Sequence, residues 1–142
     1  MRIIEAVKEY FLQCPYLKEL TRFGIEFLPE DSNTCSIEEV PVTNPILTKY
    51  VDGSSSRQFV FVFATRLNYS DEIRNNIEKS GLYEDIYNWL EENSNNDILP
   101  KLDEGLTPTK IECLTNGYLF DINGDLTNAR YQIQCRLLYD KD

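Results

Sequence analysis

Apolar residues near the start of the chain recur at the spacing of an α-helix. The predicted helix begins near Ile3 and ends before Pro15, because proline removes a backbone donor and clashes with the preceding turn. Charged residues occupy its other side, as expected for a helix that packs one face against a core. Its apolar positions are Ile3, Val7, Tyr10, Phe11 and Cys14.

A second helical pattern runs through residues 70–90. Ser70 is a suitable N-cap, and Asp71 and Glu72 suit the first turn. We expect Ser80 and Gly81 to interrupt or bend this helix. Its aromatic positions are more typical of core packing than of a ligand site. The apolar and aromatic positions beyond Gly81 are Leu82, Tyr83, Ile86, Tyr87, Trp89 and Leu90.

Residues 58–65 form an apolar run with almost no polar break, which predicts a central strand buried on both faces. A polar, turn-rich tract over 51–56 separates this run from Lys49 and Tyr50, so the two segments predict a long hairpin. Residues 36–40 predict an edge strand or an extended arm, because Pro41 and Pro45 follow closely. This arm continues to Tyr50.

Residues 130–139, in the last third of the chain, alternate between a mainly apolar and a mainly polar side, which is typical of a half-buried strand. Its predicted partner is residues 110–121, with Ile111 and Cys113 buried and Tyr118 and Phe120 as further buried candidates. Asn123 and Gly124 suit the turn between them. The inward positions are Tyr131, Ile133, Cys135, Leu137 and Tyr139, and the outward positions are Arg130, Gln132, Gln134, Arg136 and Leu138.

This order of elements predicts an α+β fold, with an antiparallel sheet of about four to five strands and helices packed on one face. The 142 residues fit a single domain over 1–142. No run approaches the 18 or more apolar residues of a membrane-spanning helix, and the charged start does not fit a signal peptide. We therefore expect a cytoplasmic protein with no membrane partner.

Charge and composition narrow the possible chemistry. The chain has 24 acidic and 14 basic residues, a net charge of -10 and no histidine. These counts exclude a Ser-His-Asp triad and an imidazole metal site, and they argue against binding by phosphate neutralisation. The four cysteines form no C-x-x-C pair and are expected to be reduced and mostly buried. We expect no catalytic residue, no cofactor and no metal.

Two short segments invite a functional interpretation that their spacing does not support. Residues 121–125 lack the glycine position and the terminal glutamate of a calcium loop, and a hairpin turn explains them better. Residues 53–57 lack the Gly-Lys-Ser/Thr ending of a phosphate-binding loop. The polar side of residues 130–136 is either an ordinary solvated sheet face or a subunit interface. The irregular segments 40–50 and 95–107 are further interface candidates.

Taken in order, several segments resemble the tail terminator (minor capsid or tail-completion) proteins of phages and prophages of clostridia and related Gram-positive bacteria. Some members carry the label "chloramphenicol resistance protein", but acetyl transfer to chloramphenicol uses a histidine base, which this chain lacks. The segments that carry the resemblance include CPYL (14–17), SIEEVP (36–41), KYVDGSSSRQF (49–59), IEKSGLY (77–83), IECLTNGYLFD (111–121) and ARYQIQCRLLY (129–139).

The resemblance implies a structural virion protein and no enzyme. It would form a ring, commonly a hexamer, on the tail tube, stop tube polymerisation and present a surface to the head–tail connector or stopper. A contractile particle would add the tail sheath as a partner, and DNA would pass through the ring without specific binding. The protein would be made and assembled in the host bacterial cytoplasm and then stay in the virion, at the head-proximal end of the tail.

Interface residues can be suggested only from the pattern of the chain. One group is the expected hairpin tip, and the other is the polar side of the last strand. These candidates are Asp52, Ser54, Ser55, Arg57, Arg130, Gln132, Gln134 and Arg136. Two other functions stay open on the sequence: a head–tail connector or stopper protein, and a small ligand-binding domain or enzyme.

Overall fold

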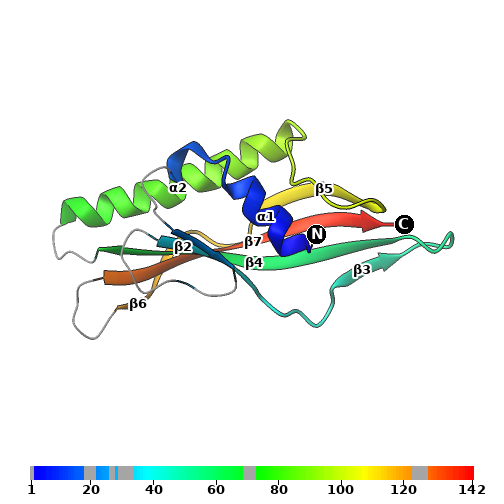
Figure 1. Ribbon diagram of the computed structural model, residues 1–142, viewed down its shortest axis with the longest axis horizontal. Coiled ribbons are helices and arrows are strands. Elements are labelled where there is room, and N and C mark those ends of the chain that lie inside the picture. Colours follow the sequence, from blue (N-terminus) through cyan, green and yellow to red (C-terminus); the bar gives the residue numbers. More distant parts are fainter. Residues whose placement is uncertain (1, 18–21, 26–27, 29–33, 69–72, 123–127) are drawn as a thin grey trace.

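The computed structural model describes residues 2–17, 22–25, 28, 34–68, 73–122 and 128–142 (Figure 1). Within these residues it has two α-helices, a short 3-10 helix and seven strands. The helical elements are α1 (Ile3–Phe11), η1 (Pro15–Leu17) and α2 (Ile73–Asn95). The strands are β1 (Arg22–Ile25), β2 (Thr34–Glu39), β3 (Ile46–Lys49), β4 (Ser55–Asn68), β5 (Leu106–Cys113), β6 (Tyr118–Ile122) and β7 (Asn128–Lys141).

All seven strands belong to one sheet that is built around the pairing of β4 with β7. The order across the sheet is β1-β2-β4-β7-β5, while β3 pairs with β4 and β6 pairs with β7. The sheet is therefore five strands wide, and each long central strand meets two shorter strands on its outer side. The predicted α+β class is confirmed.

The sheet is mixed rather than wholly antiparallel. Every pairing among the described strands is antiparallel except that of β1 with β2, which is parallel. Residues 26–33 join these two strands. This parallel pairing was not predicted, because alternation of side chains carries no information on strand direction.

Both helices lie on one side of the sheet, as predicted (Figure 1). The odd-numbered positions of β4 face them, and Phe61 and Phe63 are fully buried there. Phe11 of α1 stacks on Phe63 with ring centroids 5.1 Å apart, and it lies 5.8 Å from Trp89 of α2. Phe11 thus joins both helices to the central strand, and aromatic pairs of this kind add to the free energy of burial.

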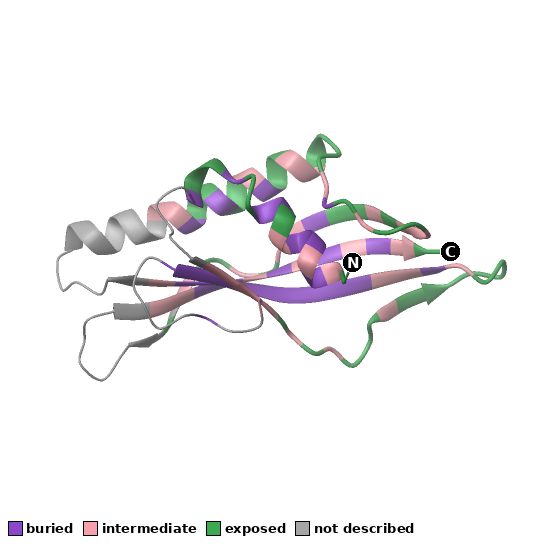
Figure 2. Ribbon diagram, viewed as in Figure 1, coloured by how far each residue is buried: buried purple, intermediate pink, exposed green. Residues whose placement is uncertain are grey.

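The predicted character of the central and final strands is confirmed. The residues of β4 from Gln58 to Thr65 are all buried, so this strand is covered on both faces (Figure 2). In β7, Ile133, Cys135 and Leu137 are fully buried on the helix side. The turn predicted at Asn123 and Gly124, and the N-cap predicted at Ser70, lie outside the described residues.

Four local predictions were wrong. The strand β2 is not at an edge, because it lies between β1 and β4 and ends before Pro41. The helix α2 continues through Gly81, since burial of the apolar residues that follow outweighs the cost of about 1 kcal/mol for a helical glycine. The segment 110–121 is two strands, β5 and β6, rather than one. Phe120 is 58% exposed, because the pairing of β6 with β7 shifts register between Leu119 and Asp121.

Glycine at position 117, between β5 and β6, allows the chain to approach α2 closely. A Cβ atom built there would lie 2.4 Å from Cγ and 2.5 Å from Cβ of Tyr83. The Tyr83 ring is buried, and its hydroxyl is 2.6 Å from Oγ1 of Thr65. This close approach leaves no room for a larger residue at position 117.

We predict that Gly117→Ala destabilises the protein by about 1–3 kcal/mol, because the Tyr83 side chain or the β5–β6 connection must shift. The matched control is Gly81→Ala, since a Cβ at this helical position meets nothing within 4 Å. The control is expected to raise stability by up to about 1 kcal/mol. Urea unfolding, followed by the fluorescence of Trp89, measures both changes. Equal effects in the two variants would contradict the steric explanation.

Candidate functional site: the polar sheet face and the β3–β4 hairpin

The side of the sheet turned away from the helices carries most of the charged side chains of β7. Cross-strand register places Arg136 beside Val60 and Glu112, and Gln134 beside Val62. We call this surface the polar face. It consists of Glu38, Gln58, Val60, Val62, Glu112, Tyr118, Arg130, Gln132, Gln134 and Arg136.

One cluster on the polar face surrounds Arg130. Its guanidinium lies 3.1 Å from both carboxylate oxygens of Glu38 on β2 and donates to Oε1 of Gln132 at 3.0 Å. Gln132 donates in turn to the Tyr118 hydroxyl at 2.6 Å. The Arg130 guanidinium also lies over the Phe120 ring, 4.9 Å from its centroid. With only 17% of its side chain exposed, Arg130 is held flat against the sheet rather than extended into solvent.

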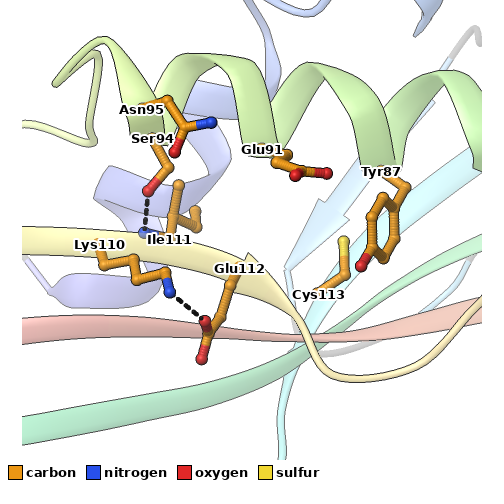
Figure 3. Close-up of a pocket in the computed structure, with 8 residues that line it drawn as sticks. All are labelled: Tyr87, Glu91, Ser94, Asn95, Lys110, Ile111, Glu112 and Cys113. Atoms are coloured by element: carbon orange, nitrogen blue, oxygen red, sulfur yellow. Dashed lines mark hydrogen bonds and ion pairs between the residues drawn. The ribbon is translucent and has the colours of Figure 1, made fainter.

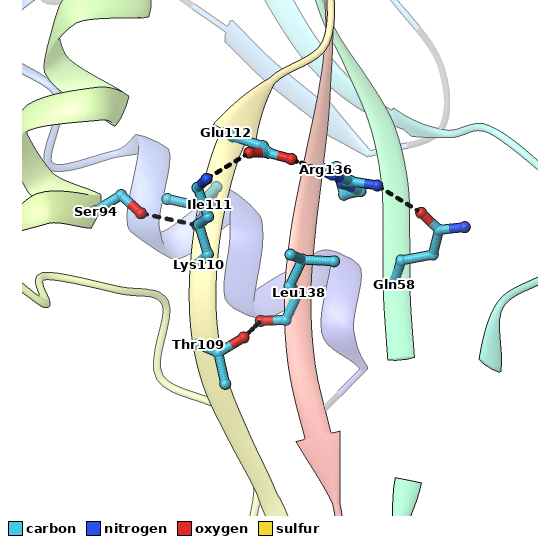
Figure 4. A network of polar contacts seen from close by, with 8 residues as sticks. All are labelled: Gln58, Ser94, Thr109, Lys110, Ile111, Glu112, Arg136 and Leu138. Carbon is cyan, nitrogen blue, oxygen red and sulfur yellow. Dashed lines mark hydrogen bonds and ion pairs between the residues drawn. The ribbon is translucent and has the colours of Figure 1, made fainter. Parts of the chain in front are cut away.

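A second cluster surrounds Arg136 (Figure 4). Arg136 donates from Nε to Oε1 of Glu112 at 3.0 Å, and a second guanidinium nitrogen also contacts this oxygen. Lys110 lies 2.9 Å from the other carboxylate oxygen of Glu112. On its far side Arg136 donates to Gln58 at 3.4 Å, and Gln58 donates to the backbone oxygen of Asn44 at 3.0 Å. This cluster therefore spans β5, β7 and β4.

The surroundings of Glu112 lower the pKa of its carboxyl group. Partial burial disfavours its charged form, but the hydrogen bonds and positive charges of Arg136 and Lys110 outweigh burial and hold the pKa of Glu112 below its usual range. The carboxylate thus stays charged at neutral pH and is neutralised by its neighbours.

An apolar strip separates the two clusters. Val60 and Val62 of β4 are each only 6% exposed, although neither points toward the helices. The long side chains of the flanking strands shield them. The two valines are therefore covered within the chain itself, and the outer surface of the polar face consists mainly of polar and charged side chains.

The β3–β4 hairpin forms a projection at one end of the sheet (Figure 1). Its turn is closed by the Tyr50 amide donating to the Ser54 carbonyl at 2.9 Å, and Gly53 adopts a φ of 92° that favours glycine. Asp52 accepts hydrogen bonds from the Ser54 amide at 2.9 Å and its hydroxyl at 2.6 Å. These bonds lower the pKa of Asp52. Asp52 and Ser54 thus have a structural role in shaping the turn.

The most exposed apolar side chains of the hairpin were not among the predicted site residues. Tyr50 is 50% exposed, Leu47 is 40% exposed, and Val51 is exposed throughout. The signal was present in the sequence, since Tyr50 and Val51 directly precede the Asp52–Gly53 turn instead of alternating with polar residues. An apolar hairpin end of this kind is typical of a contact surface.

The predicted site residues fall into two separate groups. Arg130, Gln132, Gln134 and Arg136 all lie on the polar face. Ser55 and Arg57 lie at odd positions of β4, on the helix side of the sheet, and Arg57 donates to Ser55 at 2.9 Å. The acidic partners Glu38 and Glu112 were missed, because only strand register shows which carboxylates lie beside the two arginines.

A polar hollow of about 200 Å³ lies between α2 and β5 (Figure 3). It is lined by Tyr87, Glu91, Ser94, Asn95, Lys110, Ile111, Glu112 and Cys113. Its two charged groups on β5, Lys110 and Glu112, already form an ion pair, and Ser94 accepts a hydrogen bond from the Ile111 amide at 3.3 Å. Among the described residues, no group of three or more cysteine or acidic side chains is arranged to hold a metal ion.

No known protein-family model matches this sequence, and no curated protein matches it significantly. Within the described ranges, neither helix has the length and hydrophobicity needed to cross a membrane.

The lowered pKa of Glu112 predicts a pH-dependent contribution to stability. Because its folded-state pKa lies below its unfolded value of about 4.3, the contribution is complete above that value and is lost as the pH falls through the folded-state pKa. Glu112→Gln is expected to cost about 0.5–1 kcal/mol at pH 7, the range for solvent-screened pairs, and progressively less below pH about 4. Urea unfolding across this pH range measures the difference.

The matched control is Glu92→Gln, which changes an exposed carboxylate on α2. Its effect at pH 7 should be small. A constant difference between wild type and Glu112→Gln from pH 7 to pH 3 would contradict the ion-pair explanation.

Proposed function

We propose that this protein is a structural virion assembly protein that caps the tail tube of a phage or phage-like particle as a ring. The proposal starts from the sequence resemblance to tail terminator proteins. The observation that carries it furthest is the polar face, an ordered sheet surface on the side opposite both helices. In this role the protein stops tube polymerisation and provides the surface to which the head attaches.

The polar face supports contact with a second copy of the chain. Its arginines are paired and held in place, so little side-chain entropy remains to be lost when a partner covers them. Gln132 and Gln134 add hydrogen-bond donors and acceptors to this face. In a ring, such a face would meet a different surface of the neighbouring subunit, which is the contact geometry that closes at a fixed number of copies.

The hairpin supports contact with a second component of the particle. Leu47, Tyr50 and Val51 are displayed on the β3–β4 hairpin, whose turn is fixed by Asp52 and Ser54. A projection with apolar residues at its end can reach the tube protein on one side of the ring or the connector on the other.

Electron microscopy of particles made with and without the gene tests the proposed function. Loss of the protein should give overlong tails that carry no heads, because nothing stops the growth of the tube. Tails of normal length that stay detached would instead indicate a connector or stopper protein. Normal particles would overturn both structural functions and leave the ligand-binding or enzymatic alternative.

Hairpin variants test which surface makes the contact. We predict that Val51→Asp combined with Leu47→Asp fails to restore tail length when supplied to particles that lack the gene, because charges replace the exposed apolar contact. Leu12→Asp changes a residue that is 60% exposed at the end of α1 and should restore normal tails. Thermal unfolding of each purified variant shows whether the fold is intact. Normal tail length in the double variant would exclude the hairpin as the contact.

A further inference from the structure

Two of the four cysteines lie directly opposite each other on neighbouring strands. Register pairs Cys113 of β5 with Cys135 of β7, and their sulfur atoms are 3.8 Å apart. Both are free thiols in this structure. They are 22 positions apart in the sequence, so only the pairing of β5 with β7 brings them together.

The hydrogen-bond pattern shows which kind of cross-strand pair this is. The Leu114 amide points toward β7 and donates to the Gln134 carbonyl. The Ile111 amide points away from β7 and donates to the Ser94 hydroxyl of α2. Successive amides along a strand point alternately toward and away from the neighbouring strand, so the Cys113 amide points away from β7. Cys113 and Cys135 therefore form a non-hydrogen-bonded pair. In such pairs the Cα atoms are about 4.5 Å apart, which lies within the range that a disulfide spans.

The two thiols differ in how easily a reagent in solution can reach them. Cys135 is fully buried, whereas Cys113 is only partly buried and lines the hollow between α2 and β5 (Figure 3). A small reagent can therefore reach Cys113 first. The other two thiols, Cys14 and Cys35, are 4% and 1% exposed, and burial raises their pKa to about 11 and about 12. They supply internal controls of the same residue type.

We propose that Cys113 and Cys135 form a reactive dithiol that small-molecule disulfides, such as oxidised glutathione, convert to an intramolecular disulfide. The Cys113 thiolate attacks one sulfur of the reagent, forming a mixed disulfide and releasing one small thiol. The Cys135 thiolate then attacks the Cys113 sulfur and releases the second small thiol. The two protons lost by the protein end on the two released thiols, so the protein is oxidised by two electrons and the reagent is reduced.

The new bond would change the mechanical properties of the sheet at its outer edge. It would tie β5 covalently to β7 and enclose β6 in the loop between them. In a reducing cytoplasm the pair stays a dithiol, and an oxidising medium converts it. This chemistry does not depend on the proposed role in the particle.

Mass spectrometry of the full wild-type chain tests the proposal. The folded protein is incubated with oxidised glutathione, quenched with an alkylating reagent and digested without reduction. We expect a mass lower by two hydrogens, a peptide pair linked between Cys113 and Cys135, and alkylation of Cys14 and Cys35 only after unfolding. The melting temperature should rise by roughly 5–10 °C on oxidation and return when the bond is reduced.

Single variants distinguish Cys113, which attacks the reagent, from Cys135, which attacks the mixed disulfide. Cys135→Ser should stop at a stable glutathione adduct on Cys113, and Cys113→Ser should form neither adduct nor disulfide in the folded protein. Cys14→Ser serves as the matched control and should oxidise like wild type. A wild-type chain that stays fully reduced, stops at the glutathione adduct or links other cysteines would overturn the proposal. These measurements use the isolated protein, so their outcome is separate from the tail phenotype.

Discussion

The antiparallel pairing of β4 with β7 is the constraint on which the rest of the structure depends. The two strands pair residue by residue over 14 positions, from Ser55 opposite Lys141 to Asn68 opposite Asn128. Because side chains alternate between the two faces, this single register decides what the helices cover. A slip of one residue would turn Arg136 toward the core and Leu137 toward solvent. Burial of a charge is so costly that the sequence strongly disfavours a slip by any odd number of residues.

The chemistry of the polar face follows from the same register. Arg136 lies opposite Glu112 because β5 pairs with the second half of β7, and Arg130 reaches Glu38 across β4 because β2 pairs with its second half. The Arg136–Glu112 pair forms when β5 joins β7, and the Arg130–Glu38 pair forms only when β2, β4 and β7 are all in place. The ion pairs therefore report correct assembly of the sheet more than they stabilise it, since the desolvation of these partly buried charges offsets much of their attraction.

Much of the fold could be predicted from local pattern. Within one element, the spacing of apolar residues shows which side is buried. This holds for the alternation along β7, for the apolar run in β4 and for the helical spacing of Val7 and Phe11. Contacts between distant segments could not be predicted in this way. The interior position of β2 depends on β1, and the pairing of Cys113 with Cys135 depends on register. The polar side of β7 was recognised as a candidate site, but its acidic partners were not, for the same reason.

The outer edge of β5 shows why the polar face and the hairpin are the better candidates for assembly. An exposed edge strand invites pairing with another chain, and this edge is blocked at several points. Pro108 has no amide to donate, the register shifts between Pro108 and Lys110, and the Ile111 amide is bonded to Ser94 of α2. Ladder pairing of a second copy along β5 would have to displace α2. In the proposed ring, the subunits would therefore not join by ladder pairing along β5, which leaves the polar face and the hairpin as the candidate contacts.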